Sequence, residues 1–334
     1  MQVLKDSFNR VHDYLRISLT DKCNLNCLYC NPVRSKIKPL NRNEILNFDE
    51  LLRLIRILVE GLGFKKIRFT GGEPLVRKDI LKFFAELYPL KLEYGLEIGL
   101  TTNGTLLEDV LHDLQEYGID RLNISLDSLK SERFKFITGR NNFDSVLRSI
   151  SKAYQLGFYP LKINTVVIKN INDDELIDFV DFVKNTTINV RFIEFMPFGN
   201  NNWNENGFLG YETMKARIEQ KFKLIEIASD KNKVAKDFKI EGFHGKVSFI
   251  SPISHNFCNT CNRLRISAQG KMKLCLFSTG NNELNFKELF DTSMYSDEEI
   301  AAFIQEAIKG KAKVHPGLKE LLQLEKNNML SIGG

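Results

Sequence analysis

The sequence contains no long apolar run, no block of like charge and no collagen-like or mucin-like bias. None of its hydrophobic stretches approaches the roughly 18 residues that a membrane-spanning helix needs, and the first ten residues lack the apolar stretch of a secretory signal. Lys and Arg number 47 and Asp and Glu 42, which gives a net charge of +5 spread along the chain. We therefore expect a cytoplasmic globular protein that binds no membrane and has no dedicated nucleic-acid surface.

Cysteine is missing from most of the chain. All six cysteines lie in two triplets near its ends: Cys23, Cys27, Cys30, Cys258, Cys261 and Cys275. Disulfides are disfavoured, because a long chain without an export signal belongs in a compartment that keeps thiols reduced. Short spacings within each triplet let thiolates from one loop converge on a soft metal or an iron–sulfur cluster. The sequence therefore predicts two metal sites.

A chain of 334 residues is long enough for about two domains. Six short segments rich in Ile, Val, Phe and Leu are predicted strands: 14–19, 66–70, 96–101, 121–126, 161–168 and 190–195. Amphipathic stretches are predicted helices: 48–60, 79–87, 106–117, 144–156, 173–184 and one near 212–221. Asn47 and Glu50 resemble a capping box. This alternation predicts a parallel sheet with right-handed crossovers, either open or curled into a barrel.

Polar motifs follow the first four predicted strands: the first cysteine triplet, the run Gly71-Gly72-Glu73-Pro74, Asn103-Gly104, and Asp127. Because the carboxyl ends of parallel strands share one edge, we expect these motifs at one rim. The alternation weakens after Pro197, which predicts a first domain over 1–225 and a smaller second domain over 226–334. The basic stretch 231–239 fits a solvated surface better than a nucleic-acid site.

The first triplet offers three thiolates and no fourth cysteine. Structural metal sites take four protein ligands, whereas catalytic sites keep one position open. A four-iron cluster held by three cysteines would leave one iron for a small molecule. A zinc site completed by His12 or Asp21 is the alternative, although neither residue has a usual zinc spacing.

The second triplet surrounds two arginines. Arg263 and Arg265 follow Cys261 and face the same way if the segment is extended, and guanidinium groups bind phosphates well. A zinc site of three cysteines and His255 is one alternative. Exposed arginines on an edge strand are another.

The first triplet, with Tyr29 directly before Cys30, resembles the signature of the radical S-adenosylmethionine superfamily, and the run 71–74 resembles its glycine-rich stretch. With the second triplet, nearly the whole chain resembles the GTP 3′,8-cyclase family of molybdenum-cofactor biosynthesis. Further motifs carry this resemblance: 15–23 (LRISLTDKC), 67–75 (IRFTGGEPL), 162–169 (KINTVVIK), 195–199 (FMPFG) and the terminal Gly333-Gly334. The resemblance implies an α/β fold, an incomplete (β/α)6 TIM-like barrel, with a smaller C-terminal α+β domain that carries a second cluster.

The resemblance also implies residue roles. One [4Fe-4S] cluster would be held by Cys23, Cys27 and Cys30, and a second by Cys258, Cys261 and Cys275. S-adenosylmethionine would be lined by Tyr29, Gly72, Ser125 and Met196. GTP would be contacted by Arg16, Arg68, Thr101, Lys162, Arg263, Leu264 and Arg265. Gly333 and Gly334 would enter the active site and act in catalysis with Arg263 and Arg265, whereas a frayed terminus is the alternative.

The implied reaction converts GTP to (8S)-3′,8-cyclo-7,8-dihydroguanosine 5′-triphosphate, the first step of molybdenum-cofactor biosynthesis. A radical made from S-adenosylmethionine would remove hydrogen from ribose C3′, and the carbon radical would then add to C8 of guanine. Four cations, Arg16, Arg68, Lys162 and one of the arginine pair, are expected near one rim, where they would match a triphosphate.

The family implies three partners: a low-potential electron donor, the cyclic pyranopterin monophosphate synthase that consumes the product, and, as an allowed state, a second copy in a homodimer. Two other interpretations stay open. One is a two-cluster enzyme that modifies a peptide or matures another enzyme. The other is a scaffold or electron carrier that binds zinc or a cluster without catalysis.

Overall fold

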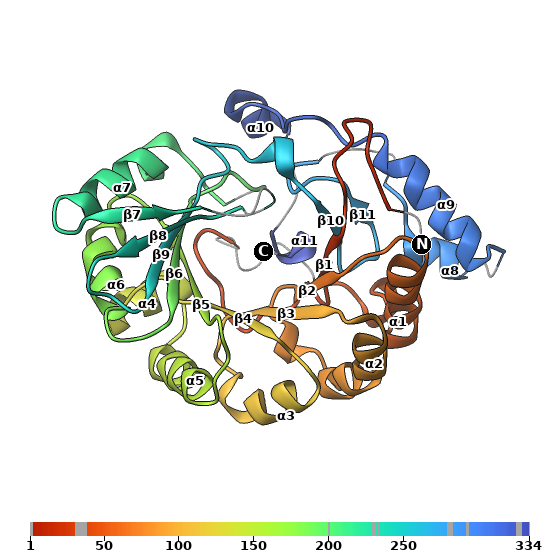
Figure 1. Ribbon diagram of the computed structural model, residues 1–334, viewed down its shortest axis with the longest axis horizontal. Helices are drawn as coiled ribbons and strands as arrows, with labels where there is room; N and C mark the ends of the chain where they lie inside the picture. The colour runs from red at the N-terminus through yellow and green to blue at the C-terminus, as the bar shows by residue number, and fades with distance from the viewer. Residues whose placement is uncertain are drawn as a thin grey trace.

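The computed structural model describes residues 3–30, 39–199, 201–228, 232, 234–278, 283–291, 294–324 and 329–333. Within these ranges the strands are β1 Tyr14–Ser18, β2 Lys66–Thr70, β3 Glu97–Thr102, β4 Arg121–Ser125, β5 Lys162–Val167, β6 Asn189–Glu194, β7 Leu224–Ile227, β8 Lys236–Ile240, β9 Lys246–Ile250, β10 Arg263–Ile266 and β11 Met272–Lys273. They form one sheet in the order β11-β10-β1-β2-β3-β4-β5-β6-β9-β8-β7. Figure 1 shows this sheet curved into an open barrel, with most helices around its outside.

The helices of the described ranges are α1 Phe48–Arg56, α2 Ile80–Tyr94, α3 Leu111–Glu116, α4 Ser131–Thr138, α5 Phe143–Gln155, α6 Leu176–Phe182, α7 Tyr211–Glu219, α8 Phe286–Asp291, α9 Asp297–Ile308, α10 Leu318–Leu324 and α11 Met329–Ile332. No helix in this part of the chain is long and apolar enough to cross a membrane. Helix α11 differs from the others because it lies inside the barrel, next to the C-terminus (Figure 1).

Strands β1 to β6 are parallel and consecutive, which confirms the predicted barrel of alternating strands and helices. The C-terminal third extends both edges of this sheet. Strand β10 adds in parallel to β1, and β9 adds in parallel to β6, with antiparallel β8 and β7 beyond it. The C-terminal third of the chain therefore flanks the barrel on both sides. The division into 1–225 and 226–334 stays a prediction.

Local sequence signals explain where α1 begins. The Asn47 side chain accepts a hydrogen bond from the Glu50 N–H (2.9 Å), and the Glu50 carboxylate accepts one from the Asn47 N–H (2.6 Å). This is the predicted capping box, which satisfies two N–H groups that have no partner inside the helix. The helix then widens into a π-turn over Ile57–Gly61, so the predicted helix 48–60 is confirmed as a continuous helical segment.

Helix α2 is longer than the predicted helix 79–87. It continues through Pro89 and ends at Tyr94. The next residue, Gly95, caps the helix with a φ of +61°. Proline removes one helical hydrogen bond and costs about 3 kcal/mol in a helix interior. Leu87 and Leu90 on either side of Pro89 are both buried in the core, and this packing offsets the cost. The prediction failed here because tertiary contacts outweighed a local breaker.

Candidate active site

Polar side chains line the inner face of the sheet. On β1, Leu15 and Ile17 pack in the hydrophobic core, so Tyr14, Arg16 and Ser18 point to the opposite side. The same alternation on later strands gives an inner row that contains Arg68, Thr70, Thr101, Asn123, Ser125, Lys162, Asn164 and Arg191. These polar side chains do not form an apolar core inside the barrel, and they suit the binding of a polar ligand.

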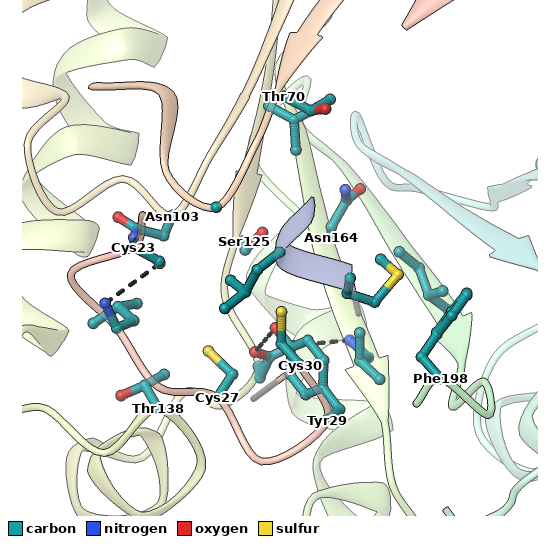
Figure 2. Close-up of a pocket in the computed structure, with 18 of the residues that line it drawn as sticks. Cys23, Cys27, Tyr29, Cys30, Thr70, Asn103, Ser125, Thr138, Asn164 and Phe198 are labelled. Carbon is teal, nitrogen blue, oxygen red and sulfur yellow. Dashed lines mark hydrogen bonds between the residues drawn. The ribbon is translucent and has the colours of Figure 1, made fainter. Parts of the chain in front are cut away.

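The first cysteine triplet and the residues predicted to bind S-adenosylmethionine line one pocket. It is lined by Cys23, Cys27, Cys30, Tyr29, Gly72, Ser125 and Met196, and also by Thr101. Figure 2 shows the cysteines and Tyr29 on one loop beside Ser125 and Asn164. The Tyr29 hydroxyl donates to Asp127 Oδ2 (2.8 Å), and Asn103 Nδ2 donates to Cys23 Sγ (3.7 Å). The prediction that these polar motifs share one rim is confirmed.

Two glycines hold the cysteine loop against β2. The Gly72 N–H donates to the Thr20 carbonyl (2.6 Å), and the Glu73 N–H donates to the Lys22 carbonyl (2.8 Å). A Cβ at Gly71 would lie 2.6 Å from the Thr20 oxygen, and one at Gly72 would overlap the Lys22 carbonyl. Only glycine lets the two backbone segments approach this closely, so these residues position the first triplet.

Burial controls the protonation of the first triplet. It raises the pKa of Cys23 and Cys27, and that of Cys30 to about 12, and nearby negative groups such as Asp127 add to the effect on Cys27 and Cys30. Burial also raises the pKa of the Asp127 carboxyl to about 6. Thiolates in this environment need directly bound cations. Three sulfur ligands, with the Leu25 N–H donating to Cys23 Sγ (3.4 Å), fit an iron–sulfur cluster.

The second triplet lies at the other end of the barrel. Cys261 comes just before β10, which runs parallel to β1, whereas the first triplet comes just after β1. Cys258, Cys261 and Cys275 line a second cavity. None of the six cysteines forms a disulfide, which disagrees with the disulfide interpretation.

Cations surround this second triplet. Lys311 is only 4% exposed, and its ammonium donates to the Arg263 carbonyl (2.6 Å). Burial would raise the pKa of Cys261, but Arg263 and Lys311 outweigh it and lower that pKa to about 7. Burial raises the pKa of Cys258. The two triplets therefore sit in opposite electrostatic environments, acidic at the first and basic at the second.

The side chains considered for zinc have other partners. His12 Nε2 lies 3.0 Å from Asp6 Oδ2, His255 Nε2 lies 3.0 Å from Glu212 Oε1, and Asp21 accepts a backbone hydrogen bond. Across the described ranges, no three His, Cys, Asp or Glu side chains are arranged as ligands of one metal ion. A four-iron cluster does not require such convergence, since each thiolate binds a different iron.

Cations crowd the interior between the two triplets. In the described part of the barrel they include Arg16, Arg68, Lys162, Arg191, Arg263 and Arg265. Burial, followed by repulsion from neighbouring arginines, lowers the pKa of Lys162 to about 8 and that of Arg191 to about 9. Arg263 Nε is buried and has no hydrogen-bond partner. Such a group of cations is stabilised by an anionic ligand.

The sequence predicted that these cations lie near the rim, and this prediction was wrong. Lys162 is the first residue of β5, and Arg16 and Arg68 are the middle residues of β1 and β2. They therefore lie deeper in the barrel than the first triplet, which follows the end of β1. The strands themselves were predicted correctly, and the error was to place their cations near the rim, although a curved sheet can also carry charge on its inner face.

Three residues of this interior were missed by sequence reasoning. Arg191 donates to Asn164 Oδ1 from Nε (2.9 Å) and Nη2 (2.6 Å). A Cβ at Gly99 would lie 2.7 Å from Arg68 Cζ, so Gly99 makes room for that guanidinium. The Tyr14 hydroxyl accepts from Arg68 Nε (2.8 Å). The available signal was alternation, because each residue takes an inward position beside apolar neighbours in its strand.

Three predicted GTP contacts, Arg263, Leu264 and Arg265, lie on β10, and they point to opposite faces of the sheet. Arg263 and Arg265 are each 7% exposed and face the barrel interior, as the predicted extended conformation requires. The side chain of Leu264 is fully buried in the hydrophobic core on the other face. Leu264 can therefore contact a ligand only through its backbone.

The C-terminal segment enters the barrel. Gly333 has a φ of +80°, and a Cβ there would overlap Thr70 Oγ1. Its carbonyl accepts a hydrogen bond from Arg265 Nη1 (3.0 Å). Figure 1 shows α11 at the centre of the barrel. Gly333 thus lies beside predicted site residues, and Gly334 lies outside the described residues.

Two family models match the chain. The model described as "Radical SAM superfamily" matches residues 17–183, and the one described as "Molybdenum Cofactor Synthesis C" matches residues 188–316. The structure is similar to Streptococcus suis SuiB bound to S-adenosylmethionine, with a TM-score of 0.60 and 17% identity over 91% of this chain and 69% of that chain. This likeness supports the fold. The class is therefore the radical SAM superfamily, whose cofactors are S-adenosylmethionine and an iron–sulfur cluster.

Curated relatives narrow the class. The chain is 41% identical to "GTP 3',8-cyclase, mitochondrial" of Arabidopsis thaliana over 99% of this chain and 84% of the relative. It is 43% identical to "GTP 3',8-cyclase" of Thermodesulfovibrio yellowstonii over 91% and 93%. It is also 44% identical to mouse "Molybdenum cofactor biosynthesis protein 1" over 99% of this chain, but it spans only 51% of that relative. The chain belongs to the GTP 3′,8-cyclase family, and it covers about half the length of its animal relatives.

Proposed function

We propose that this chain converts GTP to (8S)-3′,8-cyclo-7,8-dihydroguanosine 5′-triphosphate, the first step of molybdenum-cofactor biosynthesis. The observation that carries the proposal is the set of inward cations between two cysteine triplets. A nucleoside triphosphate has the charge to neutralise those cations, and its length would let it reach from them toward either triplet. The names of the plant and bacterial relatives support the same activity.

The first triplet and its pocket would hold the cofactors. Cys23, Cys27 and Cys30 would bind a [4Fe-4S] cluster and leave one iron for S-adenosylmethionine. Tyr29, Gly72, Ser125 and Met196 line the same pocket and would contact S-adenosylmethionine. When bound, these cofactors supply the one-electron chemistry that opens an unactivated C–H bond. The chain itself would hold the substrate close and exclude water.

The inward cations would hold the triphosphate. Arg16, Arg68, Lys162, Arg263 and Arg265 surround the space, and Arg191 completes it from β6. Thr101 would contact GTP from β3, and Leu264 would do so through its backbone. The second triplet, Cys258, Cys261 and Cys275, would bind a second [4Fe-4S] cluster with an open iron for the guanine ring. In this proposal the two reacting parts of GTP would lie between the clusters.

The C-terminal segment would complete the site. The Gly333 carbonyl holds the Arg265 guanidinium, and we assign Gly333, Gly334, Arg263 and Arg265 a direct part in catalysis. A segment inside the barrel also excludes water from the substrate. The electron donor, the synthase that consumes the product and a homodimer remain predictions of the family resemblance, and a cytoplasmic location remains a prediction of the sequence composition.

The test uses anaerobically purified protein. Iron and sulfide analysis should give about eight iron atoms per chain, as two four-iron clusters require. Reduced protein with S-adenosylmethionine should release 5′-deoxyadenosine rapidly only when GTP is added, and the GTP should be converted to the cyclised triphosphate. Zinc without iron, or cleavage that GTP does not stimulate, would refute the proposal. Stimulation by a peptide instead would favour the peptide-modifying alternative.

A further inference from the structure

A single phenol lies among the cations of the barrel interior. Tyr14 is the first residue of β1, and its hydroxyl accepts a hydrogen bond from Arg68 Nε (2.8 Å). Arg16 lies two residues along the same strand and therefore on the same face. Arg263 on β10 is the direct register partner of Tyr14. The phenol is thus flanked by guanidinium groups on its own strand and on both neighbouring strands.

Charged groups face Tyr14 from several elements, and those that interact with it are cations. They are Arg16 on β1, Arg68 on β2, Arg263 on β10, Lys162 on β5 and Arg191 on β6. Asp237 on β8 interacts with Lys162 and Arg191. Burial would raise the pKa of Tyr14, but Arg68, Arg16 and Arg263 outweigh it and lower that pKa to about 7. An ordinary tyrosine has a pKa of about 10.

This arrangement has a consequence for an incoming anion. A phenolate at Tyr14 partly neutralises the cations of an empty site, but it repels a phosphate group that comes to the same cations. A neutral phenol has an O–H that can donate to a phosphate oxygen. The state of Tyr14 that suits the empty barrel is therefore different from the state that suits the filled one.

We propose that Tyr14 is an internal counter-anion of the polyphosphate site: it is a phenolate in the empty barrel and takes up a proton when a triphosphate binds. The proton comes from solvent and forms the phenol O–H bond, and no other bond or electron changes. The hydroxyl then donates to a phosphate oxygen. This inference rests on the proposed function, because it deepens the assignment of the cations to a triphosphate.

One consequence is pH-dependent binding. Between about pH 7 and pH 8 the affinity for a triphosphate falls as pH rises, by up to about tenfold per pH unit, since one proton must be supplied. Lys162, with a pKa of about 8, also loses part of its charge over this range, but it does so in the wild type and in Tyr14→Phe alike. Tyr14→Phe removes the phenol that takes up the proton, so its affinity should fall much less than that of the wild type over the same range.

The test reads tyrosine ionisation directly. Anaerobic holoenzyme at about pH 8 is mixed with inorganic tripolyphosphate, which does not absorb in the near ultraviolet, and the difference spectrum is recorded in the band of ionised tyrosine. The wild type should lose the absorbance of one tyrosinate on binding. Tyr14→Phe should bind without that loss. Tyr154→Phe, at an exposed position on α5, is the matched control and should behave as the wild type.

A pH titration of the ligand-free holoenzyme is the second measurement. One tyrosine should ionise near pH 7 in the wild type and in Tyr154→Phe, but not in Tyr14→Phe. Binding of tripolyphosphate without bleaching, or equal bleaching in Tyr14→Phe, overturns this proposal and leaves the proposed function intact. Absence of any binding, measured by calorimetry, overturns the polyphosphate site itself and this proposal with it.

Discussion

At the residue scale, one missing side chain decides where an inward-facing arginine can lie. Gly99 on β3 is the register partner of Arg68 on β2, and the Arg68 guanidinium occupies the space that a Cβ would fill. That position brings Arg68 Nε to the Tyr14 hydroxyl. A glycine in the middle of a strand costs stability. Here it leaves the space that the Arg68 guanidinium fills.

Gly99→Ala should therefore weaken GTP binding. The added Cβ would displace the Arg68 guanidinium, and the loss of a charged hydrogen bond predicts roughly tenfold lower affinity. Calorimetric titration of GTP into the holoenzyme measures the effect. Gly317→Ala is the control, because a Cβ there meets nothing within 4 Å. Equal affinities for the two variants would show that Gly99 does not position Arg68.

Replacing Arg191 should affect GTP affinity and stability in different ways. Arg191→Met should lower GTP affinity roughly tenfold to a hundredfold, because a charged hydrogen-bond donor is lost. The thermal midpoint of the ligand-free enzyme should not fall, since a crowded buried charge is also removed. Differential scanning fluorimetry and calorimetry measure the two effects. Arg148→Met, at an exposed ion pair on α5, should change neither quantity. A large loss of stability would make Arg191 structural instead.

At the element scale, β10 and α11 bring distant parts of the chain to one place. β10 presents two arginines to the interior and Leu264 to the core. Helix α11 carries the chain into the barrel, where Gly333 meets both Arg265 on β10 and Thr70 on β2. Gly333 therefore contacts two strands at once. A small change in its position should shift the Arg265 guanidinium that it holds.

Removing Gly333 and Gly334 should abolish turnover without unfolding the protein, because no core residue is lost. Gly333→Ala should act in the same direction, since its Cβ would overlap Thr70 Oγ1. Adding Thr70→Ala removes that oxygen and should restore part of the activity of Gly333→Ala. Turnover of GTP and circular dichroism measure the effects. Retained activity in the truncated enzyme would contradict the assigned role, and additive effects of the two alanines would contradict the contact.

At the scale of the whole molecule, the described barrel interior gathers more cations than Tyr14 and Asp237 can neutralise. Its outer face is an apolar core beneath the helices, and its inner face holds cations between two sulfur-rich ends. The ligand-free protein therefore carries electrostatic repulsion, which the proposed triphosphate would remove. Stability and affinity should respond to pH in opposite directions.

The titration of Lys162 determines the direction in which stability and GTP affinity change with pH. Burial, Arg191 and Arg68 lower its pKa from 10.5 to about 8. The folded protein therefore binds this proton less tightly than the unfolded chain, so the stability of the ligand-free enzyme should rise as pH increases from about 8 toward 10. GTP affinity should fall over the same range. Thermal midpoints and calorimetry check both trends. Lys162→Met should lose this part of both pH dependences, and a variant that keeps them would assign the titration to another group.

Much of the fold was predictable because its signals are local. Segments 66–70 and 121–126 alternate apolar and polar residues, and the capping box at Asn47 starts α1 as expected. Other features were not local. Helix α2 passes through Pro89 because of packing, and the strands after residue 224 join both edges of the sheet through long-range pairing. The first cysteine loop was predictable from spacing, whereas Arg191 and Gly99 were recognisable only once their strands were placed side by side.

The sequence by itself determined the chemistry of this protein: six thiols in two triplets, the residues that follow each strand, and the parallel alternation of strands and helices. These depend on residue type and spacing within one segment. Only the tertiary structure decided that the triplets lie at opposite ends of one barrel, that the cations lie between them with Tyr14, and that the chain end enters the interior. Those facts depend on strand order and curvature, which arise from contacts between residues hundreds of positions apart.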